Sequence, residues 1–309
     1  MREKMMRLGV VIVTYNRIEK LQKTLSCYEK QLKKIDTVII VDNCSTDGTN
    51  IFLKKYVTEK RNFKIKILTM PKNIGGAGGF FEGMKYAMQT GLDWVYVSDD
   101  DAYVDDSTLI EIEKVYSQIN DKDNVVALCS VVKKENGIDY GHRLRLKRKF
   151  LTLKWKTVSE SEYKEPYFEI DIFSYVGTAI RVNSLFCAGL DRKDFFIYHD
   201  DQEHSLRLRK IGKILTCTKS VIFHDTNPIK YKRIFWGSYY NARNNLIMIK
   251  NNFPQRYYYI RYHLGYLRDC ILCRDKIKRI MMKTAYHDAR KQIMGINKVY
   301  NPSWKYDEI

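Results

Sequence analysis

The first 130 residues alternate short apolar runs with segments of helical spacing, and this alternation constrains the fold more than any other feature. The runs "LGVVIV" (8–13), "TVIIVD" (37–42) and "WVYVS" (94–98) are continuously apolar, which is typical of strands buried on both faces. "FKIKIL" (63–68) and "NVVALCSVV" (124–132) are two further expected strands. Helical segments between strands predict an α/β fold, with a mostly parallel sheet, right-handed crossovers and flanking helices.

Polar loops follow four of the expected strand regions: 14–17 (TYNR), 42–43 (DN), the glycine-rich 71–79 and 99–101 (DDD). Ligands of parallel sheets bind outside the carboxyl ends of the strands, so we expect these loops to form one site. The glycine-rich loop has neither the dinucleotide-binding nor the Walker pattern. Its glycines still permit close approach to a ligand, and a helix beginning near Gly79 would offer free N–H groups to phosphate.

Three adjacent aspartates, Asp99 to Asp101, follow the strand at 94–98. Adjacent carboxylates repel one another, and each disfavours the ionisation of its neighbours. A divalent cation bound together with phosphate would relieve this repulsion, because Mg²⁺ and Mn²⁺ prefer carboxylate and phosphate oxygens. In an extended chain Asp99 and Asp101 point to the same side. The alternative is a solvated loop that caps a helix.

A second acidic cluster opens the segment "DDQEHSLRLRKIG" (200–212), which we expect to be a helix. Two separate acidic clusters could supply two different roles, a general base in one and a metal site beside phosphate in the other. The helix N-terminus would keep Asp201 ionised. In the alternative interpretation, Asp200 and Glu203 only stabilise that N-terminus. "DIFSYVGTAI" (171–180) and "KILTCTKSVIFH" (213–224) are further expected strands, and residues 133–170 show no clear periodicity.

Positive charge and aromatic residues gather at the end of the chain, within a net charge of +18. Residues 228–309 hold 17 Lys and Arg against 5 Asp and Glu, a net charge of +12, together with 15 of the 40 aromatic residues. We expect a helical, basic region at 228–309 after a catalytic domain at 1–227. Solvated helix faces, a homo-oligomer interface, nucleic acid and an anionic membrane surface are all compatible with such charge. We expect the membrane surface and no nucleic acid, because nucleic-acid binding leaves the ordered carboxylates unexplained.

Cysteine content and hydropathy indicate the compartment. The apolar stretch near the N-terminus is too short for a signal peptide, and no segment approaches the length of a membrane span. Seven cysteines form no paired framework, and the C-x-x-C pair Cys270 and Cys273 lacks a second pair to complete a zinc site. We therefore expect a cytoplasmic protein, peripheral on the inner face of the cell membrane.

The motifs "VVIVTYNR", "VIIVDNCSTDGT", "NIGGAGGF" and "VYVSDDD", in this order and spacing, resemble glycosyltransferase family 2, most closely its galactofuranosyltransferase and rhamnosyltransferase branch. The resemblance covers about residues 8–250. It implies a GT-A (Rossmann-like) fold, a nucleotide-sugar donor, Mn²⁺ or Mg²⁺, and inversion at the anomeric carbon. UDP-galactofuranose is the expected donor and dTDP-rhamnose the alternative. The expected acceptor is a polysaccharide or lipid-linked glycan in cell-surface glycan synthesis. A sugar-phosphate nucleotidyltransferase would need a glycine in the first strand–helix turn, where this chain has TYNR.

The resemblance also assigns roles to individual residues. It assigns nucleotide-sugar binding to Thr14, Asn16, Arg17, Asp42, Asn73, Gly75, Gly76 and Asp100, and metal binding to Asp99, Asp101 and His224. "HDDQEHSLR" resembles the family's W-D-D-x-[DE] segment, whose second aspartate, here Asp201, is the general base, and His199 replaces the tryptophan. The implied acceptor-binding residues are Asp200, Glu203 and Trp236. "WGSYYNARNNLIM" (236–248) adds Tyr239, Tyr240, Arg243 and Asn244 as candidate pocket walls, unless the aromatic residues of this helix pack on the core.

Overall fold

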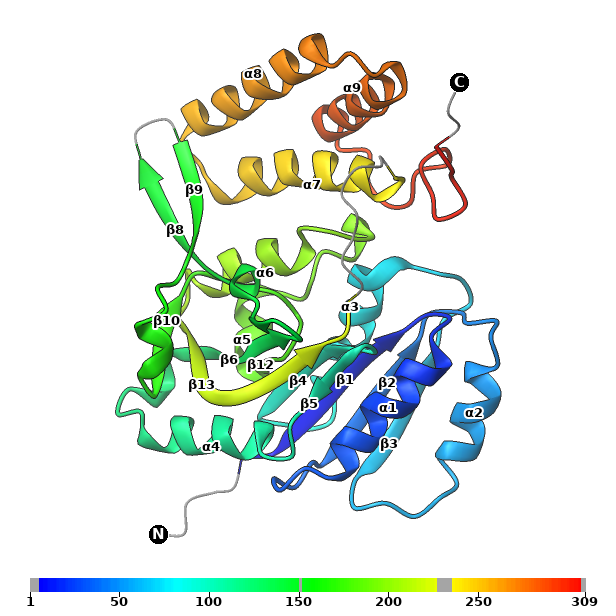
Figure 1. Cartoon of the computed structure of the whole chain (residues 1–309), viewed down its shortest axis with the longest axis vertical. Helices are drawn as coiled ribbons and strands as arrows, with labels where there is room; N and C mark the ends of the chain where they lie inside the picture. The colour runs from blue at the N-terminus through cyan, green and yellow to red at the C-terminus, as the bar shows by residue number, and fades with distance from the viewer. Residues whose placement is uncertain (1–5, 150–151, 227–234, 307–309) are drawn as a thin grey trace.

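The computed structural model of the protein describes residues 6–149, 152–226 and 235–306, and a large sheet forms its centre (Figure 1). The strands of this sheet are β1 (Leu8–Thr14), β2 (Thr37–Asp42), β3 (Lys64–Thr69), β4 (Trp94–Asp99), β5 (Ala102–Val104), β6 (Val125–Lys134), β7 (Gly137–Ile138), β10 (Tyr167–Ile170), β12 (Thr178–Arg181) and β13 (Lys213–His224). The strand order is β10-β13-β6-β12-β4-β1-β2-β3, while β5 pairs with β13 and β7 with β6.

The main strands run in one direction, and three of them end at the same level. β1 pairs in parallel with β2 and β4, β2 with β3, and β6 with β13. The register places Thr14 opposite Asp42, and Val13 opposite Asp99. β12 is antiparallel between β4 and β6. The expected α/β fold with a mostly parallel sheet is confirmed, and the polar loops after β1, β2 and β4 meet at one edge.

Helices cover both faces of the sheet (Figure 1). One face carries α1 (Ile18–Glu29), α2 (Thr49–Tyr56) and α4 (Thr108–Gln118), and the other carries α3 (Gly75–Ala87) and α5 (Val182–Ala188). Separate apolar clusters fill the two layers, with Leu25 and Ile112 in the first and Phe80 and Leu185 in the second. This three-layer packing leaves the loops at the carboxyl ends of the strands to form a site.

The remaining elements lie beyond one end of the sheet. A hairpin of β8 (Arg143–Lys149) and β9 (Thr152–Thr157) forms a smaller sheet with β11 (Ile172–Phe173). α6 (Asp200–Leu208) lies between the large sheet and the C-terminal helices α7 (Gly237–Asn252), α8 (Arg256–Leu272) and α9 (Lys276–Lys291) (Figure 1). The expected helical C-terminal region is therefore present, whereas its expected boundary at residues 227 and 228 lies outside the described residues. Across the described ranges, no helix combines the length and the apolar character required to cross a membrane.

Two expected boundaries differ from the structure. α3 begins at Gly75, four residues before Gly79. Groups outside the helix satisfy N–H donors of its first turn: Asn73 Oδ1 accepts from Gly75 N at 2.8 Å, and the Phe196 carbonyl accepts from Ala77 N at 3.2 Å. These bonds compensate for the weak helix propensity of glycine. The segment 171–180, expected as one strand, divides into β11 and β12 in different sheets.

Candidate active site

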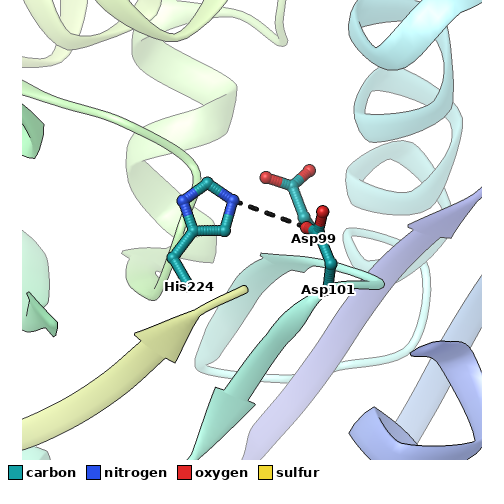
Figure 2. A group of neighbouring side chains, drawn as sticks. All are labelled: Asp99, Asp101 and His224. Atoms are coloured by element: carbon teal, nitrogen blue, oxygen red, sulfur yellow. Dashed lines mark ion pairs between the residues drawn. The ribbon is translucent and has the colours of Figure 1, made fainter. Parts of the chain in front are cut away.

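Asp99, Asp101 and His224 converge at the carboxyl ends of β4 and β13 (Figure 2). The antiparallel pairing of β5 with β13 places His224 opposite Ala102, next to Asp101 along the chain. One ligand atom from each of the three side chains lies within 4.8 Å of the others, and His224 Nε2 is 3.4 Å from Asp101 Oδ1. Two carboxylates and an imidazole form a donor set that fits a divalent metal ion.

Asp100, the middle residue of the triple aspartate, is held by the end of β1 and by the loop that follows it. Thr14 Oγ1 donates to Asp100 Oδ2 at 2.8 Å. Arg17 Nη1 donates to Asp100 Oδ1 at 3.2 Å and to Asp101 Oδ2 at 2.8 Å. The Arg17 side chain remains half exposed, with 51% of its surface accessible. Its guanidinium therefore neutralises part of the acidic cluster while still facing solvent.

The remaining charge is unevenly compensated. Burial and the neighbouring charge of Asp101 raise the pKa of Asp99 to about 7. Burial also raises the pKa of Asp100 to about 6, against the opposing effect of Arg17. For Asp101 burial acts in the same direction, but the hydrogen bond to His224 and the charge of Arg17 outweigh it and lower the pKa. Asp99 is thus the carboxylate that a cation would stabilise most.

Two expected nucleotide-site residues hold the strand-end loops together. Asn16 Oδ1 accepts from Thr46 N at 2.7 Å, and Asn16 N donates to Ser45 Oγ at 3.0 Å. Asp42 Oδ1 accepts from Ser45 N at 2.9 Å, so this carboxylate caps a turn and not α2, whose N-cap residue is Gly48. Neither Asn16 nor Asp42 lines the cavity described next.

Asn43, expected in a site loop but without a role of its own, connects two of the loops. Its buried amide Nδ2 donates to Asn73 Oδ1 at 3.0 Å and to the Gly75 carbonyl at 3.1 Å, and its Oδ1 accepts from Ile74 N at 2.9 Å. Asn43 therefore ties the loop after β2 to the start of α3. Its position directly after a buried strand was the only available signal.

A first cavity of about 280 Å³ opens at this sheet edge. It is lined by Val13, Thr14, Tyr15, Arg17, Asn43, Asn73, Gly75, Gly76, Asp99, Asp100, Phe196, Ile197, Trp236 and Pro302. Six of the eight expected nucleotide-sugar residues are in this set. Trp236, expected at the acceptor, lies with them and lines this first cavity.

A second cavity of about 320 Å³ adjoins the first and shares Gly76, Asp99 and Ile197 with it. It is lined by Gly76, Phe80, Asp99, Ser174, Tyr175, Val176, Ile197, Tyr198, His199, Asp200, Asp201, Gln202 and Asn241. Asp99 of the first acidic cluster and Asp200 and Asp201 of the second, distant in sequence, therefore face one cavity.

The electrostatic state of Asp201 differs from the expectation. Asp201 Oδ1 accepts from the backbone N of Gln202 at 2.7 Å, at the start of α6. Burial, followed by the negative charges of Asp200 and Asp99, nevertheless raises the pKa of Asp201 well above its usual range. Burial also raises the pKa of Asp200 to about 6. Burial thus opposes the ionisation that the helix N-terminus was expected to favour.

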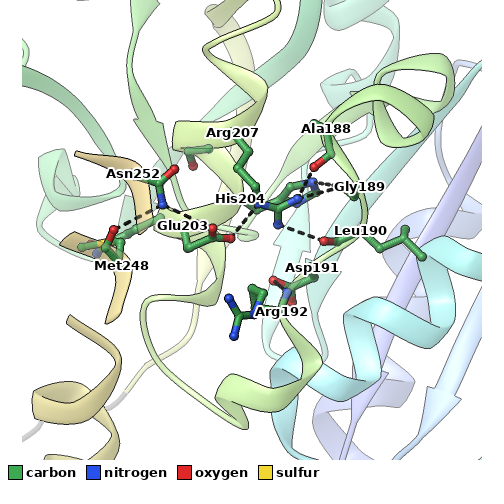
Figure 3. A network of polar contacts seen from close by, with 12 residues as sticks. Ala188, Gly189, Leu190, Asp191, Arg192, Glu203, His204, Arg207, Met248 and Asn252 are labelled. Atoms are coloured by element: carbon green, nitrogen blue, oxygen red, sulfur yellow. Dashed lines mark hydrogen bonds and ion pairs between the residues drawn. The ribbon is translucent and has the colours of Figure 1, made fainter. Parts of the chain in front are cut away.

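Glu203, expected to bind the acceptor, belongs to a buried network instead (Figure 3). Its Oε2 accepts from Arg207 Nε at 2.8 Å, and its Oε1 accepts from Asn252 Nδ2 at 3.2 Å. Its side chain is 3% exposed and lines neither cavity. The expectation for Glu203 is therefore corrected, because its position one helical turn from Arg207 directs the carboxylate into an ion pair.

This arrangement agrees with comparisons to known proteins. Residues 9–196 match the sequence profile of the family described as glycosyl transferase family 2. The chain belongs to glycosyltransferase family 2. The expected family is thereby confirmed, and the protein is a glycosyltransferase.

Relatives and solved structures extend the comparison. The chain is 27% identical over 234 residues to galactofuranosyltransferase GlfT1 of Mycobacterium tuberculosis, covering 74% of this chain and 73% of the relative. It is 26% identical over 229 residues to the GlfT1 of Mycolicibacterium smegmatis, covering 74% of each. Similar folds include GalNAc-T7 with UDP, GalNAc and Mn²⁺ (TM-score 0.65, 14% identity, 94% of this chain and 57% of the other). Another is S. aureus TarS 1-349 with UDP-GlcNAc (TM-score 0.60, 17% identity, 92% and 81%).

The wall between the two cavities of this glycosyltransferase has an unusual backbone. Phe196, Tyr198 and His199 have φ angles of 68°, 65° and 64°, a left-handed region that side chains other than glycine rarely adopt. Each such residue costs on the order of 1–3 kcal/mol and persists only where the surroundings fix it. The segment 195–199, which leads directly into Asp200, is therefore held in place by its neighbours.

Asn244 and Arg243, buried on α7, supply that support. Asn244 Nδ2 lies 3.0, 2.9 and 2.9 Å from the carbonyl oxygens of Phe195, Ile197 and Tyr198. Arg243 Nη2 donates to the Phe195 carbonyl at 3.1 Å, and Arg243 Nε donates to Asn244 Oδ1 at 2.9 Å. Both residues were candidate pocket walls, but neither lines a cavity. Both residues instead hold the segment 195–199 through hydrogen bonds to its backbone carbonyls.

We expect Asn244→Ala to destabilise the protein, because the carbonyls of Ile197 and Tyr198 lose their amide donor and that of Phe195 keeps only Arg243. The free energy of unfolding, measured by urea denaturation, should fall by about 1–3 kcal/mol. Asn245→Ala on the same helix is the matched control, since Asn245 is only partly buried, and it should change stability by much less. Equal stability of the two variants would contradict the role of Asn244.

Proposed function

We propose that this glycosyltransferase is an inverting, metal-dependent galactofuranosyltransferase. It would move galactofuranose from UDP-galactofuranose to a polysaccharide or lipid-linked glycan in cell-surface glycan synthesis. On this proposal residues 1–227 form the catalytic domain, residues 228–309 complete it, and the protein works at the inner face of the cell membrane. The donor sugar is inferred from the relatives named galactofuranosyltransferase.

One observation carries the proposal: a potential metal site and a second carboxylate pair face two adjoining cavities. Asp99 contributes to the three-residue cluster and lines both cavities, while Asp200 and Asp201 line only the second. Transfer with inversion requires this separation, because the leaving diphosphate and the attacking hydroxyl lie on opposite sides of the anomeric carbon.

The first cavity would hold the nucleotide and its diphosphate. Arg17, half exposed beside Asp100, offers a guanidinium to the phosphates. Gly76 has no side chain, and no other atom fills the space beside it at the junction of the cavities, where the sugar would lie. Asp42 lies outside the lining of this cavity, so on this proposal it would accept the imide N–H of a uracil ring that extends past the cavity toward the end of β2. Trp236 would contact the donor, since it lines this cavity and not the second.

Asp99, Asp101 and His224 would hold Mn²⁺ or Mg²⁺. When bound, the cation neutralises the charge that develops on the leaving diphosphate. His224 Nε2 already faces Asp101, so the three ligands need little rearrangement to bind an ion.

Asp201 would act as the general base. It removes the proton of the acceptor hydroxyl, whose oxygen then forms the new glycosidic bond on the face opposite the departing UDP. The bond between the anomeric carbon and the phosphate oxygen breaks with its electron pair on UDP, which inverts the configuration. Asp200, buried beside Asp201, would bind the acceptor.

The first test uses a panel of UDP-galactofuranose, dTDP-rhamnose, UDP-GlcNAc and GDP-mannose, with nucleotide release measured in Mn²⁺, Mg²⁺ or excess chelator. We expect preference for UDP-galactofuranose and loss of turnover in chelator. Asp101→Asn should abolish metal-dependent turnover, whereas Asp105→Asn, at an exposed neighbouring site, should not. Full activity in excess chelator would exclude the metal role, and preference for dTDP-rhamnose would identify the alternative donor.

Gly76 and Gly75 allow a paired test of the donor position. No atom lies within 4 Å of a Cβ added at Gly76, so Gly76→Ala should fold normally. Its methyl group would enter both cavities, and we expect the affinity for UDP-galactofuranose, measured by calorimetry, to fall about tenfold, equivalent to about 1.4 kcal/mol. At Gly75 the φ angle is +78° and a Cβ would lie 2.0 Å from the Phe196 carbonyl oxygen, so Gly75→Ala should lower the melting temperature instead. Unchanged affinity in Gly76→Ala would place the donor elsewhere.

Asp201→Asn retains the size of the side chain but cannot accept the proton. Turnover with saturating substrates should fall on the order of 10²–10⁴-fold, while donor affinity should change little. Because burial raises the pKa of Asp201, wild-type turnover should increase as pH rises through that pKa, and the variant should lack this increase. Asp200→Asn is the control and should weaken acceptor binding more than turnover. Near-normal turnover in Asp201→Asn would refute the assignment.

A further inference from the structure

A stripe of large apolar side chains runs along the exposed face of α8. It consists of Tyr257, Ile260, Leu264, Leu267 and Ile271, whose exposed fractions are 38%, 54%, 60%, 40% and 76%. Spacings of three and four residues place these side chains on one side of a helix. We call this set the α8 stripe. Burying the α8 stripe would be favourable, because it would remove apolar surface from water.

Arginines border the α8 stripe along both of its edges. Helical periodicity places Arg256 along one edge and Arg261 and Arg268 along the other, while Arg274 follows the end of α8 at Leu272. All four are exposed, and Arg268 also pairs with Asp269 at 2.7 Å. Residues 256–291 contain ten Lys and Arg against three Asp and Glu. The surface around the stripe is therefore strongly cationic.

The acidic residues of this region do little to offset its charge. Asp275 caps α9, accepting from Lys278 N at 2.8 Å, and Asp288 accepts a hydrogen bond from Tyr239 in the interior. The partner of the stripe must therefore supply negative charge beside apolar surface. A second copy packed through the stripe would instead oppose arginine to arginine, which disfavours self-association.

We propose that the α8 stripe docks on an anionic membrane surface. α8 lies at the end of the molecule away from the large sheet, so it can meet a flat surface without obstruction from the sheet (Figure 1). The apolar side chains insert between lipids and the bordering arginines contact anionic headgroups. No residue of α8 lines either cavity, so membrane docking leaves both cavities accessible.

The docking is tested by flotation of the full chain with vesicles of phosphatidylcholine, with or without phosphatidylglycerol. The wild type should bind only the anionic vesicles, and binding should decrease with salt. Arg256→Gln with Arg261→Gln should reduce partitioning about thirtyfold. Ile260→Gln with Leu264→Gln should reduce it at least about tenfold for each residue replaced.

Matched controls come from α2. Ile51→Gln removes an apolar side chain that is 72% exposed, and Lys54→Gln with Lys55→Gln removes two exposed charges. These variants should bind vesicles like the wild type. UDP affinity, measured on every variant, should remain unchanged, so a failure of membrane docking is distinguishable from a failure of the proposed catalytic function.

Three results would overturn the proposal. The first is equal binding to neutral and anionic vesicles, and the second is vesicle binding that the α8 substitutions leave unaltered. The third is a dimer in light scattering that Ile260→Gln with Leu264→Gln dissociates, combined with an absence of vesicle binding by the wild type. That last outcome would assign the stripe to a second copy of the chain.

Discussion

The structure of the site depends on how the negative charge of Asp99 to Asp101 is compensated. Three parts of the chain that are distant from this cluster in sequence contribute: the end of β1 and the loop after it supply Thr14 and Arg17, α1 supplies Lys20, whose Nζ lies 3.7 Å from Asp101 Oδ2, and β13 supplies His224. Each partner neutralises or hydrogen-bonds one part of the cluster. Asp99, whose pKa is raised to about 7 by burial and by the charge of Asp101, is the least compensated carboxylate and lies where the two cavities meet. The fold thus brings its least compensated carboxylate to the place where a cation and a diphosphate would bind.

The parallel part of the sheet could be predicted because each strand carries its own signal. The apolar runs of β1, β2 and β4 are continuous, whereas a half-exposed strand would alternate apolar and polar residues. Because ligands bind at the carboxyl ends of parallel strands, the polar loops after these runs could then be placed on one edge. β8 and β9 lacked such a signal, and β12 was expected only as the end of one longer strand over 171–180. β8 and β9 are rich in Lys and Arg, and β12 is only four residues long and antiparallel between β4 and β6. Long-range pairing, which is not encoded locally, decides their conformation.

Within the site, sequence reasoning identified residues better than it identified their orientation. Glu203 and Asp201 lie two residues apart on one helix, yet the first turns toward Arg207 and Asn252 and the second toward the second cavity. The different directions of the two side chains depend on the positions of their tertiary partners, which the local sequence does not give. The positive φ angles of Phe196 and Tyr198 contradict the preferences of those residue types, and the Asn244 amide that bonds the carbonyls of Phe195, Ile197 and Tyr198 is a tertiary contact that local sequence does not encode.

The shared wall of the two cavities bears on the sequence of events in catalysis. Gly76, Asp99 and Ile197 belong to both spaces, so a molecule occupying the first forms part of the surface that a molecule entering the second encounters. A molecule bound in the second cavity would likewise obstruct a molecule that enters the first cavity later, at the residues that both cavities share. On the proposed assignment of donor and acceptor to the two cavities, this geometry favours compulsory-order kinetics, in which the nucleotide-linked sugar enters before the acceptor and the free nucleotide departs last. It also limits wasteful hydrolysis, because the arriving acceptor displaces water from the space beside the activated sugar.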